Sequence, residues 1–174
     1  GPLAGPVVAA IVVFDRACLE NLADSKILSA KRRLELNREI VRCALAVGIG
    51  VVDNGTIDTI NILNATKVAM SQAWRNLRMK PDYLLVDALE PEDLAARVKL
   101  EGLIKGDSLC ASIAAASIVA KVYRDRLMVW YHKTYPQYNF YKNKGYPTRE
   151  HYRALQKYGC CPLHRRSFRG VVNE

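Results

Sequence analysis

The residues from Val7 to Phe14 form an unbroken apolar run, VVAAIVVF, in which β-branched side chains predominate. A strand with one solvated face alternates apolar and polar residues, whereas a strand covered on both faces does not need to. The run therefore predicts a strand in the interior of a layered protein. It is too short to cross a bilayer and has no basic leader, so we expect neither a membrane segment nor a signal peptide here.

Strand patterns and helix patterns alternate along the rest of the chain. The sequence predicts helices over 29–47, 56–77, 108–134 and 147–158, and strands at 51–52, 83–86 and 98–104, with Gly48 and Gly50 ending the first helix. This alternation is typical of an α/β protein with a mostly parallel or mixed sheet. We expect one domain over 1–174, with the sheet and its helices to about 135 and a helical, basic segment from about 136.

The chain has 26 Lys and Arg against 17 Asp and Glu, which gives a net charge of +9. An excess of this size favours a polyanionic partner such as a nucleic acid. The candidate contacts lie in a loop at 24–26, an aromatic and basic loop at 138–146, and the basic tail: Ser25, Lys26, Lys142, Lys144, Tyr146, His164, Arg165, Arg166 and Arg169. Each group taken alone is equally consistent with a solvated surface.

The five cysteines, Cys18, Cys43, Cys110, Cys160 and Cys161, include no CxxC pair. This usage predicts reduced thiols in a cytoplasmic protein. Cys161 and His164 have the spacing of metal ligands, but no further residue completes a zinc set, and we interpret Cys161 as a packed thiol.

Two acidic residues are placed where chemistry could occur. Asp87 directly follows the predicted strand at 83–86, and the carboxyl ends of strands are where α/β proteins carry their sites; it could equally cap the turn that follows. Asp125 falls on the predicted long helix, stacked with Ser117 and Lys121, and could instead form a surface pair with Lys121. Two such carboxylates could bind Mg²⁺ or Mn²⁺, which prefer oxygen ligands.

A series of short blocks, in a fixed order, resembles ribonuclease HII of the bacterial type. The blocks are residues 1–10 (GPLAGPVVAA), 24–29, 57–66, 85–87 (LVD), 105–107 (KGD), 112–125, 144–151 and 164–168 (HRRSF). One block alone has little specificity, but the ordered series covers nearly the whole chain and is highly specific.

The resemblance implies a ribonuclease H-like fold: a mixed five-stranded sheet flanked by helices, with a helical C-terminal part. It implies a monomeric endoribonuclease of the bacterial cytoplasm that cuts RNA–DNA hybrids and single ribonucleotides in duplex DNA, with Mn²⁺ or Mg²⁺ held by four carboxylates. Asp87 and Asp125 match two of these catalytic, metal-binding carboxylates. The resemblance implies phosphate contacts from Ser25, Lys26, His164, Arg165 and Arg166, and places Tyr146 against the sugar at the RNA–DNA junction.

The sequence departs from the family at its first residue. The family carries Asp-Glu-Ala-Gly-Arg-Gly on a central strand, and Gly1, a predicted substrate contact, matches only the final glycine. We therefore expect an N-terminally truncated chain that lacks two metal ligands and the first central strand, with little or no activity. Ala88 stands where the family usually has Gly, for which we expect only a local effect.

Two other functions remain open from the sequence. A nucleic-acid-binding module without catalysis would need only the net charge of +9 and the basic loops. A basic structural component of a larger ribonucleoprotein would account for the charge but not for the ordered blocks.

Overall fold

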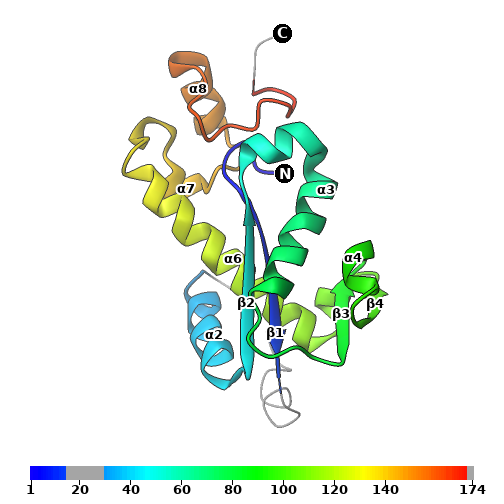
Figure 1. The fold of residues 1–174 in the computed structure, drawn as a ribbon. Coiled ribbons are helices and arrows are strands. Elements are labelled where there is room, and N and C mark those ends of the chain that lie inside the picture. Colours follow the sequence, from blue (N-terminus) through cyan, green and yellow to red (C-terminus); the bar gives the residue numbers. More distant parts are fainter. Residues whose placement is uncertain (15–29, 172–174) are drawn as a thin grey trace. The chain divides into compact units, whose positions relative to one another are not determined.

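The computed structural model describes residues 1–14 and 30–171 (Figure 1). The chain divides into two compact units, each described by itself: a first unit of Gly1–Val7, Val52–Ala65 and Tyr123–Glu174, and a second unit of Val8–Val51 and Thr66–Val122. The elements follow in the order β1 (Val7–Val13), α2 (Ala30–Cys43), β2 (Ala46–Val52), α3 (Asn54–Arg75), β3 (Tyr83–Asp87), α4 (Glu92–Ala95), β4 (Lys99–Leu103), α5 (Gly106–Leu109), α6 (Ala111–His132), η1 (Pro136–Tyr138), α7 (Phe140–Asn143) and α8 (Arg149–Tyr158).

Strand β1 is covered on both faces in the second unit, as its unbroken apolar sequence predicts. Ile11 belongs to a hydrophobic cluster with side chains of α3 and β3. Its neighbours Ala10 and Val12 pack against a different cluster, built by side chains of α2 and α6. Because successive side chains of a strand point to opposite faces, β1 lies between two layers of helix, and the α/β prediction is confirmed for this unit.

The glycines of β2 allow α3 to approach this strand closely. A Cβ atom on Gly50 would overlap the carbonyl oxygen of Ala69, and a Cβ on Gly48 would overlap that of Ala73. Ala69 and Ala73 are themselves fully buried. The prediction that these glycines end a helix is wrong: they lie inside a strand whose backbone contacts a helix backbone.

The described strands form two pairs. β1 pairs with β2, and β3 pairs with β4 in parallel, with Tyr83 opposite Lys99 and Asp87 opposite Leu103 (Figure 1). Strands β1 and β3 both line a cavity of about 490 Å³. Among the described residues, the expected single mixed sheet is therefore present as two pairs with a cavity between β1 and β3.

The first unit has its own core, in which the N-terminal residues contact distant parts of the sequence. Leu3 and Ala4 pack with Met128 of α6 and with Tyr138 and Phe140. Ala4 also forms a β-bridge with His164. Leu3 and Ala4 are thus part of the core of the first unit.

Two predicted helices differ from the observed ones. The helix predicted over 108–134 is divided into α5 and α6, because Cys110 adopts an extended conformation with φ −130° and ψ 121°. Helix α3 is kinked at Asn61, whose φ of 67° and ψ of 166° are non-helical. The Asn61 side chain accepts a hydrogen bond from the Asn64 N–H at 3.1 Å, so it caps the second segment of α3.

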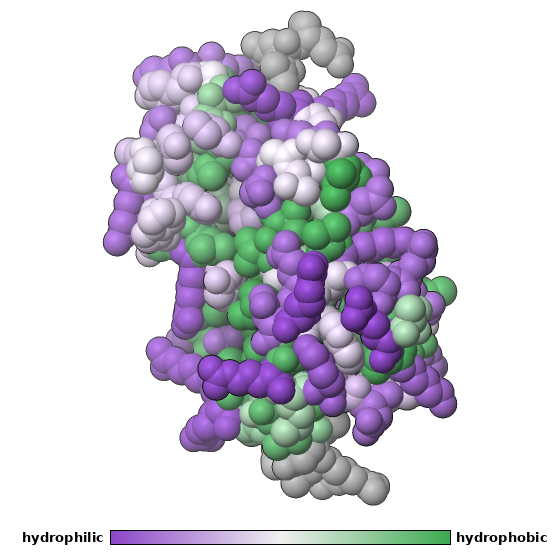
Figure 2. Space-filling view, viewed as in Figure 1, coloured by the Kyte–Doolittle hydropathy of each residue, from purple (hydrophilic) through white to green (hydrophobic). Residues whose placement is uncertain are grey.

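Cys110, Cys160 and Cys161 are free thiols, whereas Cys43 forms a disulfide. The prediction of reduced thiols is therefore wrong for Cys43 and holds for the other three described cysteines. Within the described residues, no helix has the length and apolar character needed to cross a membrane. Hydrophilic residues cover most of the face drawn in Figure 2.

Candidate functional site

Asp87 is the last residue of β3 and is exposed, at the carboxyl end of the strand as predicted; the strand itself is only partly buried, through Leu84 and Val86. Its carboxylate accepts a hydrogen bond from the Gly106 N–H at 2.9 Å. A Cβ on Gly106 would lie 2.6 Å from Cδ1 of Ile113, so only a residue without a side chain fits there without displacing a neighbour. The next residue, Ala88, has a left-handed φ of 57°. A glycine at that position would adopt this conformation without strain, which gives a physical reason for the family's usual residue.

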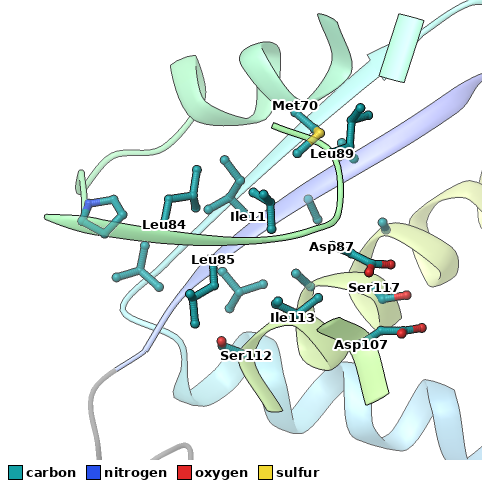
Figure 3. A pocket seen from close by; sticks show the side chains of 18 of the residues that line it. Ile11, Met70, Leu84, Leu85, Asp87, Leu89, Asp107, Ser112, Ile113 and Ser117 are labelled. Carbon is teal, nitrogen blue, oxygen red and sulfur yellow. The ribbon is translucent and has the colours of Figure 1, made fainter. Parts of the chain in front are cut away.

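The cavity beside β3 is apolar at one end and polar at the other. Figure 3 shows the Asp87, Asp107 and Ser117 side chains gathered at one end, with Leu84 and Leu85 at the other. Asp107 was not predicted as a site residue, although its position directly after Gly106 is a signal that could have suggested it. Carboxylates and a hydroxyl at an open cavity end suit a hard cation or a water network.

The donor chemistry fits Mg²⁺ or Mn²⁺, but the number of ligands is small. Asp87 belongs to the second unit, and Asp125, a half-buried residue of α6, belongs to the first. Within residues 1–14 and 30–171, no group of three or more His, Cys, Asp or Glu side chains is arranged to hold a metal ion. Magnesium usually takes one or two protein carboxylates and completes its shell with water and substrate phosphate, so the Asp87 carboxylate alone is within the number of protein ligands that this ion uses.

His164 and Arg165, two of the predicted phosphate contacts, are buried, with exposed fractions of 1% and 2%. Arg165 donates from Nε to the Gly5 carbonyl at 3.0 Å and from a terminal nitrogen to the Pro6 carbonyl at 3.1 Å. Burial, followed by the nearby Arg124 cation, lowers the pKa of Arg165 to about 10. These two side chains have a structural role in this conformation. The sequence did not predict this, because a run of basic residues does not show which of their side chains are buried.

Arg124 completes this internal support of the N-terminal segment. Its buried guanidinium donates to the carbonyl oxygens of Ala4, Pro6 and Lys144 at 2.9, 3.0 and 3.0 Å. Burial lowers the pKa of Arg124, while the neighbouring Tyr146 and Asp125 act in the opposite direction. The residue preceding the candidate metal ligand Asp125 therefore fixes the backbone on which Tyr146 is carried.

Arg166, in contrast, is exposed on a turn held by Asp58. The Asp58 carboxylate accepts from the backbone N–H groups of Arg166 and Ser167, each at 2.9 Å, and from the Ser167 hydroxyl at 2.6 Å. Burial alone would raise the pKa of Asp58, but the hydrogen bonds from Ser167 and Arg166 lower it below its ordinary value. Sequence reasoning gave Asp58 no role, since its partners are distant in the chain.

Tyr146 is one of two exposed aromatic residues of the predicted basic loop, with 39% of its surface accessible; the other is Tyr141. Gly145 before it has φ 83°, and a Cβ there would lie 2.5 Å from the Ala4 carbonyl oxygen, so this position requires glycine. The Arg124 guanidinium carbon lies 5.6 Å from the Tyr146 ring centroid. The ring is therefore supported from within the protein and accessible from outside.

The remaining predicted contacts are at the N-terminal end and in the 24–26 loop. Gly1 is exposed, and a Cβ on it would lie in ordinary contact, 3.6 Å, with the Phe168 ring. Ser25 and Lys26 lie outside the residues that the structure describes.

Comparison with known proteins identifies the family. The family model for ribonuclease HII matches residues 1–171. This chain belongs to the ribonuclease HII family. A ribonuclease HII from Syntrophus aciditrophicus strain SB is 52% identical over 170 residues, covering 97% of this chain and 79% of that protein. One from Enterococcus faecalis strain V583 is 53% identical over 169 residues, covering 97% of this chain and 65% of that protein.

Solved structures of this family share the fold. The ribonuclease H2 of Pyrococcus horikoshii OT3 superposes with a TM-score of 0.81 at 24% identity, covering 98% of this chain and 90% of that one. The ribonuclease HII in the PCNA complex from Archaeoglobus fulgidus has a TM-score of 0.77 at 26% identity, covering 95% and 87%. The expected ribonuclease H-like α/β fold is confirmed.

Proposed function

We propose that this ribonuclease HII homologue is an endoribonuclease that hydrolyses the RNA strand of RNA–DNA hybrids and single ribonucleotides in duplex DNA. The observation that carries the proposal is the placement of Asp87: it ends strand β3, is oriented by the Gly106 N–H at 2.9 Å, and lies at the polar end of the cavity. A net charge of +9 suits a nucleic-acid substrate.

The proposed chemistry depends on Mn²⁺ or Mg²⁺, for which Asp87 and Asp125 are the candidate ligands. When bound, such ions activate water and stabilise the leaving oxygen of an in-line displacement. The protein's own part would be to hold the substrate: Arg166, Ser25, Lys26 and Gly1 would contact the backbone. The Tyr146 ring would stack on the sugar at the RNA–DNA junction, where a 2′-hydroxyl distinguishes RNA from DNA.

We also propose that this ligand set is too small for efficient turnover. Fewer than three potential metal-binding side chains meet at any one place within the described residues. The cavity between β1 and β3 supports the idea that a further strand, bearing the family's Asp-Glu pair, completes the site. The chain alone would then show little or no cleavage, and an extension ending in Asp-Glu-Ala-Gly-Arg directly before Gly1 would restore it.

The test is cleavage of a DNA duplex carrying one ribonucleotide, with Mn²⁺, by the chain and by the extended chain. The control is Asp87→Asn in each background. Cleavage by the extended chain that disappears in Asp87→Asn supports the proposal. A folded extended chain that does not cut would overturn it.

A second candidate is a nucleic-acid-binding module without catalysis, which the small ligand set favours. It predicts hybrid binding that weakens steeply with salt and does not change in Asp87→Asn. Metal-dependent cutting would exclude it. We propose a monomer in the bacterial cytoplasm in either case; sedimentation analysis of the free chain tests the oligomeric state.

A further inference from the structure

Two buried histidines of the first unit are joined by a direct hydrogen bond. His151 of α8 has an exposed fraction of 0% and His164 of 1%, and their Nε2 atoms lie 3.0 Å apart. In such a contact one ring must donate and the other must accept, so the pair has a direction.

The groups at the two ends determine that direction independently. Nδ1 of His151 lies 2.9 Å from the Tyr146 carbonyl oxygen, which can only accept, so this nitrogen carries the proton. A neutral His151 then has a bare Nε2 and must accept from His164 Nε2–H. At the other end, Nδ1 of His164 lies 2.9 Å from the Cys161 backbone N–H, which can only donate, so this nitrogen is bare.

Both ends therefore give the same chain of bonds: Cys161 N–H to His164, His164 to His151, and His151 to the Tyr146 carbonyl. If His164 Nδ1 carried a proton, it could donate to the Cys161 carbonyl oxygen at 3.3 Å. That proton would then also face the Cys161 backbone N–H, which is itself a donor, so this tautomer is unfavourable. A second proton on His151 would place two donors 3.0 Å apart. Both rings are thus neutral, each in one tautomer, and burial lowers both of their pKa values.

The surroundings of the pair reinforce this neutral state. The Tyr138 ring lies 4.8 Å from the His164 ring, and the Phe140 ring lies 5.6 Å from the His151 ring, both in edge-on arrangements. The Tyr138 hydroxyl donates to the Gly159 carbonyl at 2.8 Å and so does not compete for either imidazole.

The chain of bonds ends on the peptide that carries the exposed Tyr146 ring. The Tyr146 carbonyl also accepts from the Thr148 N–H at 2.9 Å, and the Tyr146 N–H donates to the Asn143 carbonyl at 2.9 Å. The bond from His151 is therefore one of the contacts that hold this peptide, and the Arg124 guanidinium lies 5.6 Å from the Tyr146 ring centroid.

We propose that His151 and His164 are positioning residues that orient Tyr146 toward a bound ribonucleotide-containing duplex. Neither histidine touches the substrate; both act through the Tyr146 carbonyl. The inference rests on the proposed function, because it takes Tyr146 to be a substrate contact.

The test uses two substitutions at the same buried position. His151→Asn places an amide N–H near the Nδ1 position and keeps a donor for the Tyr146 carbonyl, while losing His164. His151→Gln places an amide oxygen near the Nε2 position and keeps an acceptor for His164, while releasing the Tyr146 carbonyl. Each loses one buried hydrogen bond, so a merely structural role predicts similar effects from both.

The readout is the dissociation constant for a DNA duplex with one ribonucleotide, measured by fluorescence anisotropy without metal. We expect His151→Gln to weaken binding roughly tenfold and His151→Asn no more than about threefold. In a Tyr146→Ala background the difference between the two variants should vanish. Equal effects of the two variants, or a difference that persists without the Tyr146 ring, would overturn the inference.

Nitrogen NMR of the two imidazoles separates the possible failures. It should show His151 protonated at Nδ1 and His164 at Nε2 near neutral pH, whatever the activity of the chain; the opposite tautomers would contradict the relay. If Tyr146→Ala alone leaves binding unchanged, the proposed contact itself is wrong, and the positioning role is overturned with it.

Discussion

The backbone N–H of Gly106 donates to the Asp87 carboxylate at 2.9 Å. Gly106 is buried, whereas Asp87 is exposed, so the bond joins the interior of the second unit to the polar end of its cavity. One carboxylate oxygen of the candidate catalytic residue is therefore oriented by the fold before any ligand binds.

This bond predicts different stabilities for two Asp87 variants. Asp87→Asn keeps an oxygen acceptor for Gly106 N–H and should change the free energy of unfolding by less than about 0.5 kcal/mol. Asp87→Ala leaves that N–H without its partner and should cost about 1–2 kcal/mol. Urea unfolding of the three proteins measures both values. Equal losses in the two variants would show that the bond does not hold in solution.

Ala88, the next residue, predicts a stabilising substitution. Its φ of 57° is costly for a residue with a Cβ, so Ala88→Gly should raise the free energy of unfolding by about 0.5–1 kcal/mol, after the greater entropy of the unfolded glycine is subtracted. Ala114→Gly inside α6 is the matched control and should lower it by about 1 kcal/mol. Destabilisation by both glycines would contradict the left-handed turn after β3.

The adjacent Arg165 and Arg166 should affect different properties, the stability of the fold and the binding of DNA respectively. Arg166 is exposed, and Arg166→Gln should reduce the slope of log Kd against log salt by about 1 for a DNA duplex, without changing the melting temperature. Arg165 is 2% exposed and bonded to the Gly5 and Pro6 carbonyls, so Arg165→Gln should lower the melting temperature. An unchanged melting temperature in Arg165→Gln would argue against its internal role.

The histidine pair predicts how stability depends on pH. Burial, and then the nearby His151, lower the pKa of His164 from 6.5 to about 4 in the folded protein. Between these values the unfolded chain binds a proton that the folded chain does not, so stability is complete above about pH 6.5 and falls as the pH decreases toward about 4. The slope should reach about 1.4 kcal/mol per pH unit for one proton.

The measurement is urea unfolding at several pH values between 7 and 4. The hydrogen bonds of Asp58 lower its pKa, so they change the stability only at pH values near and below 3.8, which lie outside the range measured. A double variant, His151→Gln with His164→Gln, should show a flatter dependence. An equally steep dependence in that variant would assign the effect to other groups.

Local patterns in the sequence predicted that β1 is covered on both faces and that Asp87 follows a strand. Both predictions depend only on neighbouring residues: the absence of apolar–polar alternation in β1 and the end of an apolar run before Asp87. The inward turn of His164 and Arg165 was not predictable in this way. Their partners, His151 and the Gly5 carbonyl, are distant in the chain, and a basic run appears the same whether it is solvated or buried. The break between α5 and α6 at Cys110 was not predicted from the sequence for a related reason: helical residues flank it on both sides, so the local pattern is that of one helix.

The most direct test of the account is cleavage of a DNA duplex bearing one ribonucleotide, with Mn²⁺, by the chain extended with Asp-Glu-Ala-Gly-Arg before Gly1. Asp87→Asn in the same extended chain is the control, since it should preserve the Gly106 bond. The account predicts a cut at the ribonucleotide that the control abolishes. A well-folded extended chain that leaves the duplex intact, or a control that cuts as fast as its parent, would contradict it.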